Sequence, residues 1–150
     1  MSGYRTPKVE ALNAVLEMII GDYASAKPAA APAVAATHRA IYLDRADVTV
    51  ASCRCDIGAA AGLSCALSMI PPAGCEDMAA SGELTAMALS NLNEVMNIFS
   101  NLFMDDHSAH LRLRGVDTDV AEEVPAGAAD VVFDLELGRY GKGQIAFRHV

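Results

Sequence analysis

Two stripes of polar residues, one near each end of the chain, carry side chains that could bind a partner molecule or hold a water. Each has a hydroxyl, then a carboxylate, then an amide, at spacings of four and three residues. On an α-helix these spacings place the side chains on one face. The stripes are Thr6, Glu10, Asn13 and Glu17 near the start, and Ser90, Glu94, Asn97 and Asn101 later.

The second stripe belongs to a polar face of unusual composition. Between Glu83 and Asp105, Glu94 is the only charged residue, and four asparagines lie in the same stretch. A solvated helix face normally carries Lys, Glu and Arg, which are good helix formers, whereas Asn lowers helix propensity. A surface of amides and hydroxyls around one carboxylate therefore indicates a specific contact more than an ordinary solvated face.

Hydrophobic periodicity and turn residues predict the elements that must position these stripes. Thr6 is expected to cap the first helix and Ser81 to lie near the cap of the second. Residues 24–36, rich in Ala and Pro, are expected to form an extended connector, and residues 141–143 a hairpin turn. The predicted helices are 7–21, 75–80 and 83–104, and the predicted strands are 38–43, 47–55, 61–70, 110–114, 131–137 and 144–149.

These elements predict an α+β fold in a single domain over residues 1–150. Two long helices with one apolar face each should lie on one face of an antiparallel sheet, with the polar stripes outward. The order helix, strand, strand, strand occurs in both halves. Glu10 and Glu94, like Asn13 and Asn97, are 84 residues apart. We therefore expect an internal repeat related by a pseudo-twofold axis.

Charge and composition exclude several classes of function. The formal net charge is −8, which argues against a nucleic-acid partner and against binding to anionic membranes. No apolar run approaches the roughly 18 residues that span a bilayer, and residues 1–8 lack an apolar signal region. We expect a cytoplasmic protein. Its cysteines should be small buried hydrophobes in a reducing compartment, and they are Cys53, Cys55, Cys65 and Cys75.

Other clusters of reactive side chains have simpler explanations. Asp105, Asp106, His107 and His110 lie close together and could form a metal site, but a polar turn after the second long helix is favoured. The glycine-rich stretch 138–143 lacks the order of a phosphate-binding loop before a helix, and it is expected to be a turn. We therefore predict no metal site in the protein.

The segment Ser90-x-x-x-Glu94-x-x-Asn97 resembles the motif [Asp/Ser]-x-x-x-Glu-x-x-Asn of the CheC/CheX family of chemotaxis phosphatases. Residues 62–69, followed by a short helix, resemble the segment that precedes the motif helix in that family. Thr6, Glu10 and Asn13 are similar to a second copy of the motif, although Thr6 departs from its Asp or Ser. In element order, the resemblance covers nearly the whole chain.

The resemblance implies a phosphatase that acts on the phospho-aspartate of a CheY-like response regulator. It implies that Glu94 pairs with a lysine of the regulator and that Asn97 holds the attacking water through its amide. Ser90 and Asn101 would contact the partner or border the contact, and Thr6, Glu10 and Asn13 would form a candidate second site. The protein would carry no cofactor of its own, because the regulator supplies Mg²⁺. Relatives of CheX type also imply a homodimer.

Two other functions agree with the same residues. A non-catalytic module could bind a response regulator without hydrolysing its phosphoryl group, as expected of flagellar switch proteins with a similar fold. A structural dimerisation domain within a signalling assembly is the third alternative. The presence of both Glu94 and Asn97 favours the phosphatase over the non-catalytic module, and the sequence leaves the structural domain open.

Overall fold

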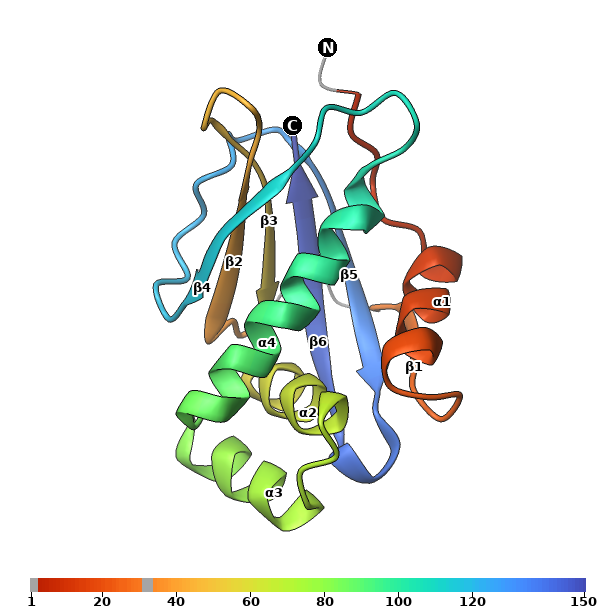
Figure 1. Ribbon diagram of the computed structural model, residues 1–150, viewed down its shortest axis with the longest axis vertical. Helices are drawn as coiled ribbons and strands as arrows, with labels where there is room; N and C mark the ends of the chain where they lie inside the picture. Colours follow the sequence, from red (N-terminus) through yellow and green to blue (C-terminus); the bar gives the residue numbers. More distant parts are fainter. Residues whose placement is uncertain (1–2, 31–33) are drawn as a thin grey trace.

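The computed structural model describes residues 3–30 and 34–150, and these form an antiparallel sheet with helices on it (Figure 1). The helices in the described residues are α1 (Val9–Ile19), α2 (Ile57–Leu67), α3 (Pro72–Ser81) and α4 (Ala86–Phe99), with 3₁₀ turns η1 (Ser100–Phe103) and η2 (Gly138–Tyr140). The strands there are β1 (Ser25–Pro28), β2 (His38–Leu43), β3 (Thr49–Cys55), β4 (Arg112–Asp117), β5 (Ala129–Glu136) and β6 (Lys142–His149).

The strand order is β1-β5-β6-β3-β2-β4, so β6 and β3, the last strand of each half, form the centre. Exchanging β1, β2 and β3 with β4, β5 and β6 gives the same order read backwards. Helices α1, α2 and α4 lie on one face of the sheet, and α3 packs beside α2 (Figure 1). The α+β class and the antiparallel sheet with two motif helices on one face are as predicted.

A cluster of aromatic rings joins α4 to the sheet. Phe99 lies 5.9 Å from Phe147, Phe103 lies 5.7 Å from Phe147 and 5.5 Å from Tyr42, and Phe133 lies 6.0 Å from Phe147, measured between ring centroids. All five rings are almost completely buried. Because α4 contributes one of these rings and η1 another, the cluster fixes the angle at which α4 crosses the sheet.

The predicted strand over residues 61–70 is wrong, because residues 61–67 belong to helix α2 and the next three form the turn after it. The carboxylate of Asp56 caps the helix and accepts a 2.9 Å hydrogen bond from the amide of Ala59. The helix is buried on nearly all sides, so it lacks the amphipathic period that marks a surface helix. Gly58 allows close packing on β6, since a Cβ there would lie 2.3 Å from the carbonyl oxygen of Lys142.

Strand β1 was not predicted, because its sequence lies in the Ala- and Pro-rich segment expected to be a connector. It pairs with the edge of β5 over only four residues and ends at Pro28, which is tolerated at a sheet edge. Residues 31–33 of the expected connector lie outside the described residues. The first half therefore has three strands, as predicted. They are β1, β2 and β3, so β1 takes the place of the strand that was predicted over residues 61–70.

Both long helices are shorter than predicted. Helix α1 begins at Val9 with Lys8 as its N-cap, so Thr6 is not the cap. Thr85, and not Ser81, caps α4, and its hydroxyl accepts a 3.2 Å hydrogen bond from the amide of Ala88. Residues 141–143 do not form the hairpin turn, because the β5–β6 turn is made by η2, with the amide of Leu137 bonded to the carbonyl of Gly141 at 2.8 Å.

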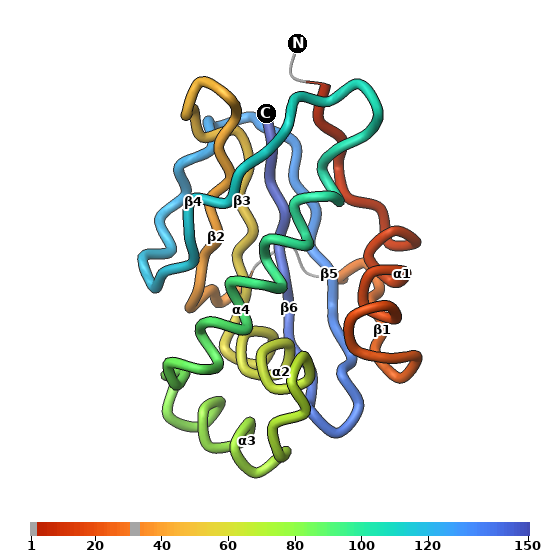
Figure 2. Tube along the Cα trace, viewed as in Figure 1, coloured from red at the N-terminus to blue at the C-terminus, as the bar shows by residue number. Residues whose placement is uncertain are grey.

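The connection between β4 and β5, residues 118–128, runs along the sheet edge and then behind the sheet (Figure 2). Its Glu122 carboxylate accepts a 3.0 Å hydrogen bond from Ser52 and lies 3.4 Å from the guanidinium of Arg54, both on β3. Arg39 on β2 is 3% exposed and donates a hydrogen bond to the carbonyl of Ala121. These bonds hold the connection against the face that the helices leave open.

Candidate functional site

The outer face of α4 presents the second polar stripe to solvent. Ser90, Glu94 and Asn97 are exposed. On the opposite face of the helix, Leu92, Val95 and Phe99 are fully buried. The predicted helical register is thus confirmed, and the side chains of the motif are accessible to a partner.

Three members of the stripe face a groove of about 480 Å³ between α4 and β4. Strand β4 forms the other wall because it is an edge strand, paired only with β2 within the described sheet. The residues that line the groove are Ser90, Asn93, Glu94, Asn97, Leu113 and Arg114. The groove therefore has a negative group on α4 and a positive group on β4.

Hydrogen bonds from neighbouring elements fix α4 on both sides of the motif. The hydroxyl of Tyr42 donates a 2.6 Å hydrogen bond to the carbonyl of Met96. The amide of Asn91 donates to the carbonyl of Ser64 at 2.9 Å and to the hydroxyl of Ser68 at 2.6 Å. Asn91, which the sequence groups with the polar face, thus joins α4 to α2 and does not belong to the groove.

The side chains of Asn97 and Glu94 form no hydrogen bond or ion pair with any other group in residues 3–30 and 34–150. The carbonyl of Asn97 accepts a 2.7 Å hydrogen bond from Ser100, so its main chain is engaged. An amide offers both a donor and an acceptor, and the Asn97 residue is exposed. Both residues of this pair are therefore exposed at the groove.

Asn101 lies beyond the groove. It belongs to η1, where the chain leaves the α-helical spacing of 3.6 residues per turn. Its side-chain amide donates a 3.1 Å hydrogen bond to the carbonyl of Ile98. The structure therefore brings Ser90, Glu94 and Asn97 together and leaves the fourth member of the stripe outside.

The residues of the first motif copy have different surroundings. The hydroxyl of Thr6 lies 2.9 Å from Nε2 of His149, and Glu10 is exposed on α1. Both ends of the Asn13 amide are engaged, since its nitrogen donates to the carbonyl of Ala26 at 3.0 Å and its oxygen accepts from the main-chain amide of Ala26 at 2.7 Å. The structure thus attaches β1 to α1 through the asparagine of this copy.

Sequence reasoning missed the wall opposite the motif, which consists of Leu113 and Arg114, and it left Asn93 without a role. Arg114 is exposed, and its guanidinium lies 2.7 Å from the carboxylate of Glu123. That hydrogen bond raises the pKa of Arg114 and lowers the pKa of the Glu123 carboxyl. The clean alternation of residues 110–114 predicted the strand, but nothing local indicates that it lies beside α4.

The remaining candidates have structural roles. Residues 105–108 form the predicted polar turn, in which the carboxylate of Asp105 accepts a 2.8 Å hydrogen bond from the amide of His107. That bond lowers the pKa of Asp105. The four cysteines are buried and unbridged. Within the described ranges, no three His, Cys, Asp or Glu side chains form a metal-binding group, and no helix is long and apolar enough to cross a bilayer.

No protein-family model matches the sequence, and no curated protein is similar to it at a significant level. Solved structures do match. The FliM middle domain from H. pylori covers 94% of this chain, and 84% of that domain is covered, with a TM-score of 0.62 and 8% identity. This chain has the fold of the FliM middle domain. A chain of the FliG–FliM complex from H. pylori matches with a TM-score of 0.51 and 9% identity, covering 94% of this chain and 85% of that one.

The likeness to FliM is one of fold, since so few residues are identical. A chain of the CheX–CheY–BeF3–Mg²⁺ complex from Borrelia burgdorferi covers 90% of this chain and 90% of its own length at 11% identity. Its TM-score of 0.43 is too low to establish a common fold. The FliM-like fold explains the sheet and the position of α4 on it, whereas the polar groove is a property of this chain's own residues.

Proposed function

We propose that this protein binds a phosphorylated receiver domain of CheY type and hydrolyses its phospho-aspartate. One observation carries the proposal: Glu94 and Asn97 project side by side into an open groove, and neither side chain is used within the described chain. The motif resemblance given above supplies the substrate class. The same residues would be poorly explained as a solvated helix face.

An acyl phosphate is already activated, so catalysis requires little more than a water in line and support for the charge of the transition state. The amide of Asn97 can orient such a water, because it offers a donor and an acceptor. Glu94, three residues earlier on the same face, can pair with a lysine of the receiver and set the register of docking. Neither role requires a metal on this chain, and Mg²⁺ would come with the receiver.

The proposal assigns one site to each chain. The amide of Asn13 bonds to the main chain of Ala26, so the first motif copy lacks a free water-holding group. We interpret the two helices as descendants of a duplication in which only the copy on α4 retained a binding surface. The symmetry of the strand order is what such a duplication would leave.

A homodimer remains a prediction. Strand β1 is a poor edge for pairing with a second copy, because it has four residues and ends in Pro28. Strand β4 is the longer edge, but it also forms a wall of the groove. Light scattering measures the mass in solution, and a monomer at high concentration would contradict the dimer.

The second candidate function is a non-catalytic adaptor that binds a receiver domain or another protein. The fold favours it, because two FliM structures that match this fold are complexes, one with SpeE and one with FliG. An adaptor would use the groove for docking and would leave the phosphoryl group in place. The phosphatase needs the Asn97 amide to orient the attacking water, whereas an adaptor does not.

The test is to mix the protein with a panel of phosphorylated receiver domains from the same cell and to follow phosphate loss. The phosphatase predicts accelerated loss from at least one receiver, and Glu94→Ala should weaken both binding and rate. Glu10→Ala is the matched control, since Glu10 is an exposed glutamate of the first copy. Binding without phosphate loss would establish an adaptor for receivers. Absence of binding to any receiver would contradict the phosphatase and would leave only an adaptor for a protein of another class.

A further inference from the structure

Arg114 is the positive group of the groove, but it is not neutralised by the negative group that shares the groove. It lines the wall opposite Glu94, and within the described residues its ion pair is with Glu123, at 2.7 Å. Glu123 lies in the β4–β5 connection, outside the groove lining. The groove therefore presents separate groups of opposite charge.

We propose that Arg114 binds an oxyanion of the docked receiver domain, exchanging Glu123 for an oxygen of the partner. This inference rests on the proposed function, since it takes the receiver as the occupant of the groove. The oxyanion is either the phosphoryl group or a carboxylate on the receiver surface, and both offer the paired oxygens that a guanidinium binds. Arg114 is then a specificity residue that complements Glu94.

The exchange is favourable because the Arg114–Glu123 pair is accessible. The side chains are 39% and 40% exposed, and an ion pair in that position contributes little to stability. A partner that covers the groove would remove water from Arg114 and strengthen a new pair relative to the old one. The intramolecular pair is therefore a weak competitor for the partner's oxyanion.

Glu123 also keeps a cation after Arg114 leaves it. Its carboxylate lies 3.7 Å from the guanidinium of Arg39, which is almost fully buried and is also paired with Asp117 at 3.2 Å. The release of Arg114 thus does not leave the Glu123 carboxylate unpaired. The ion pair with Arg39 also anchors Glu123, and the anchored Glu123 holds Arg114 at the groove wall in the free protein.

Two charges of opposite sign on opposite walls would also orient the partner. A receiver that offers a lysine to Glu94 and an oxyanion to Arg114 fits in one direction, and the reversed direction places like charges together. Such a pairing predicts selectivity among receivers, according to which ones carry an oxyanion at the matching distance from the lysine.

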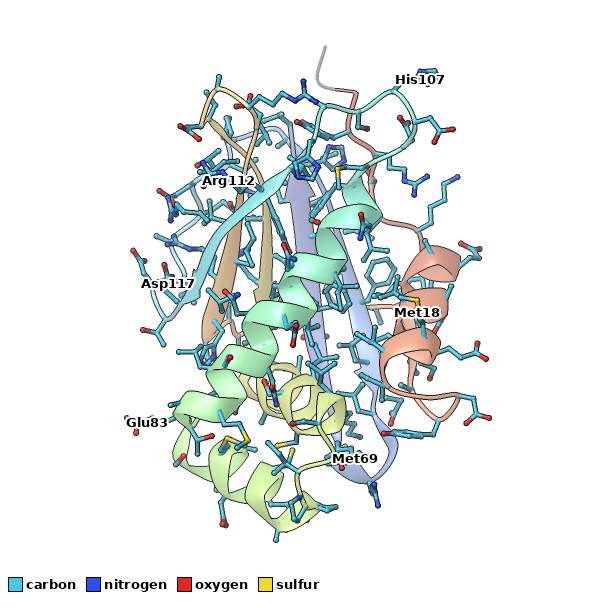
Figure 3. The ribbon with its side chains drawn as sticks, in the orientation of Figure 1. Met18, Met69, Glu83, His107, Arg112 and Asp117 are labelled. Carbon is cyan, nitrogen blue, oxygen red and sulfur yellow. The ribbon has the colours of Figure 1, made fainter. Side chains whose placement is uncertain are left out.

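Arg112 provides a matched control on the same strand. It lies two residues before Arg114, is exposed and forms an ion pair with Asp47, but it does not line the groove. Figure 3 shows it near the opposite end of β4 from Asp117. The pairs Arg114–Glu123 and Arg112–Asp47 allow identical charge changes at the groove and away from it.

The experiment measures the affinity of each variant for the receiver panel, with each receiver in two forms: with Mg²⁺ alone, and with Mg²⁺ and beryllium fluoride, which mimics the phosphoryl group. R114Q should weaken binding by about tenfold to a hundredfold, the loss expected for one charge-assisted hydrogen bond in a covered site. R112Q should change it less than about twofold. A loss confined to the beryllium fluoride form identifies the phosphoryl group, and an equal loss in both forms identifies a surface carboxylate.

E123Q removes the internal competitor and should strengthen binding by up to about fivefold, while D47N should not. In the double variant R114Q/E123Q the gain should disappear, because it acts through Arg114. A purely structural role for the pair predicts instead that E123Q and R114Q weaken binding alike. Unfolding curves for each variant identify any loss of binding that comes from destabilising the ion pairs of Arg39 with Glu123 and Asp117.

The outcomes separate this inference from the function on which it rests. If the wild type binds a receiver and R114Q binds it equally well, this inference is overturned and the proposed docking stands. If the wild type binds no receiver in either form, both are overturned. Binding that depends on Arg114 without phosphate loss would keep the oxyanion site and replace the phosphatase by the adaptor.

Discussion

The hydroxyl of Tyr42 donates a 2.6 Å hydrogen bond to the main-chain carbonyl of Met96, the residue immediately before Asn97. This bond joins the buried face of β2 to the point on α4 where the proposed water-holding residue projects. Burial raises the pKa of Tyr42 far above its ordinary value, so the phenol keeps its proton. The sheet therefore fixes the position of Asn97 relative to the walls of the groove.

Tyr42→Phe should lower the free energy of unfolding by about 1 kcal/mol and reduce phosphate release several-fold, because a small displacement of a positioning group is costly. Tyr140→Phe is the matched control. The hydroxyl of Tyr140 is buried with no hydrogen-bond partner in the described chain, so its removal should leave stability unchanged or higher. Denaturant unfolding and single-turnover rates measure both effects, and equal behaviour of the two variants would contradict the anchoring role of Tyr42.

Asn97→Ala should slow phosphate release by about 10²–10³-fold, the usual loss for a polar group placed for the transition state. The same change should raise the free energy of unfolding by about 0.5 kcal/mol, since Asn97 is exposed in a helix and Ala is the better helix former. Receiver affinity should change little. A variant that is less stable than the wild type, or equally active, would show that the amide has another function.

Asn13→Ala should have the opposite effects on stability and activity: it should destabilise the protein and leave phosphate release unchanged. Both hydrogen bonds from its amide to Ala26 are lost, which should lower the free energy of unfolding by about 1–3 kcal/mol. Phosphate release should remain at the wild-type rate at temperatures where the variant is folded. Hydrogen exchange at β1 gives a local measurement, and we expect faster exchange there. A loss of activity in the folded variant would restore the first motif copy as a second site.

Stability should fall in alkaline solution because of the buried thiols. Burial raises the pKa of Cys65 from 9.0 to about 12, and burial also raises the pKa values of Cys53, Cys55 and Cys75. These groups stay protonated in the folded protein while they ionise in the unfolded chain. Their contribution is therefore complete below about pH 9 and is lost as the pH rises toward 12.

Urea unfolding between about pH 8 and pH 10.5, with a reducing agent present, measures this slope. Cys65→Ala should flatten it, although the variant will be less stable at neutral pH because a buried group is removed. Stability that rises with pH over this range would contradict the assignment of these thiols as buried neutral groups.

The register of the motif helix was predictable from sequence, because alternation between buried and exposed positions is a local property of α4. Leu92, Val95 and Phe99 repeat at helical spacing, and Glu94 and Asn97 necessarily face the other way. Helix α2 was not predictable in the same manner. Its run of alanines and Gly62 is buried on all sides, and a short apolar segment without a polar face has the same pattern in a helix and in a strand.

The second wall of the groove depends on contacts that are distant in sequence. Arg114 lines the same groove as the motif because β4 pairs with β2 at the edge of the sheet and passes beside α4. Strand β1 is similar, since Ser25–Pro28 becomes a strand only through its pairing with β5 and the side chain of Asn13. Local sequence propensity does not reveal such pairings. The wall of the groove that β4 forms was therefore missing from the site predicted from sequence.

The connection across the back of the sheet has an electrostatic consequence at long range. Its acidic residues form ion pairs with Arg39, Arg54, Arg114 and Arg148, so these positive charges are neutralised internally. With a net charge of −8, the field that an approaching molecule meets is mainly negative. A partner of the same sign would be repelled until it reached the groove, and added salt would then accelerate its association instead of slowing it.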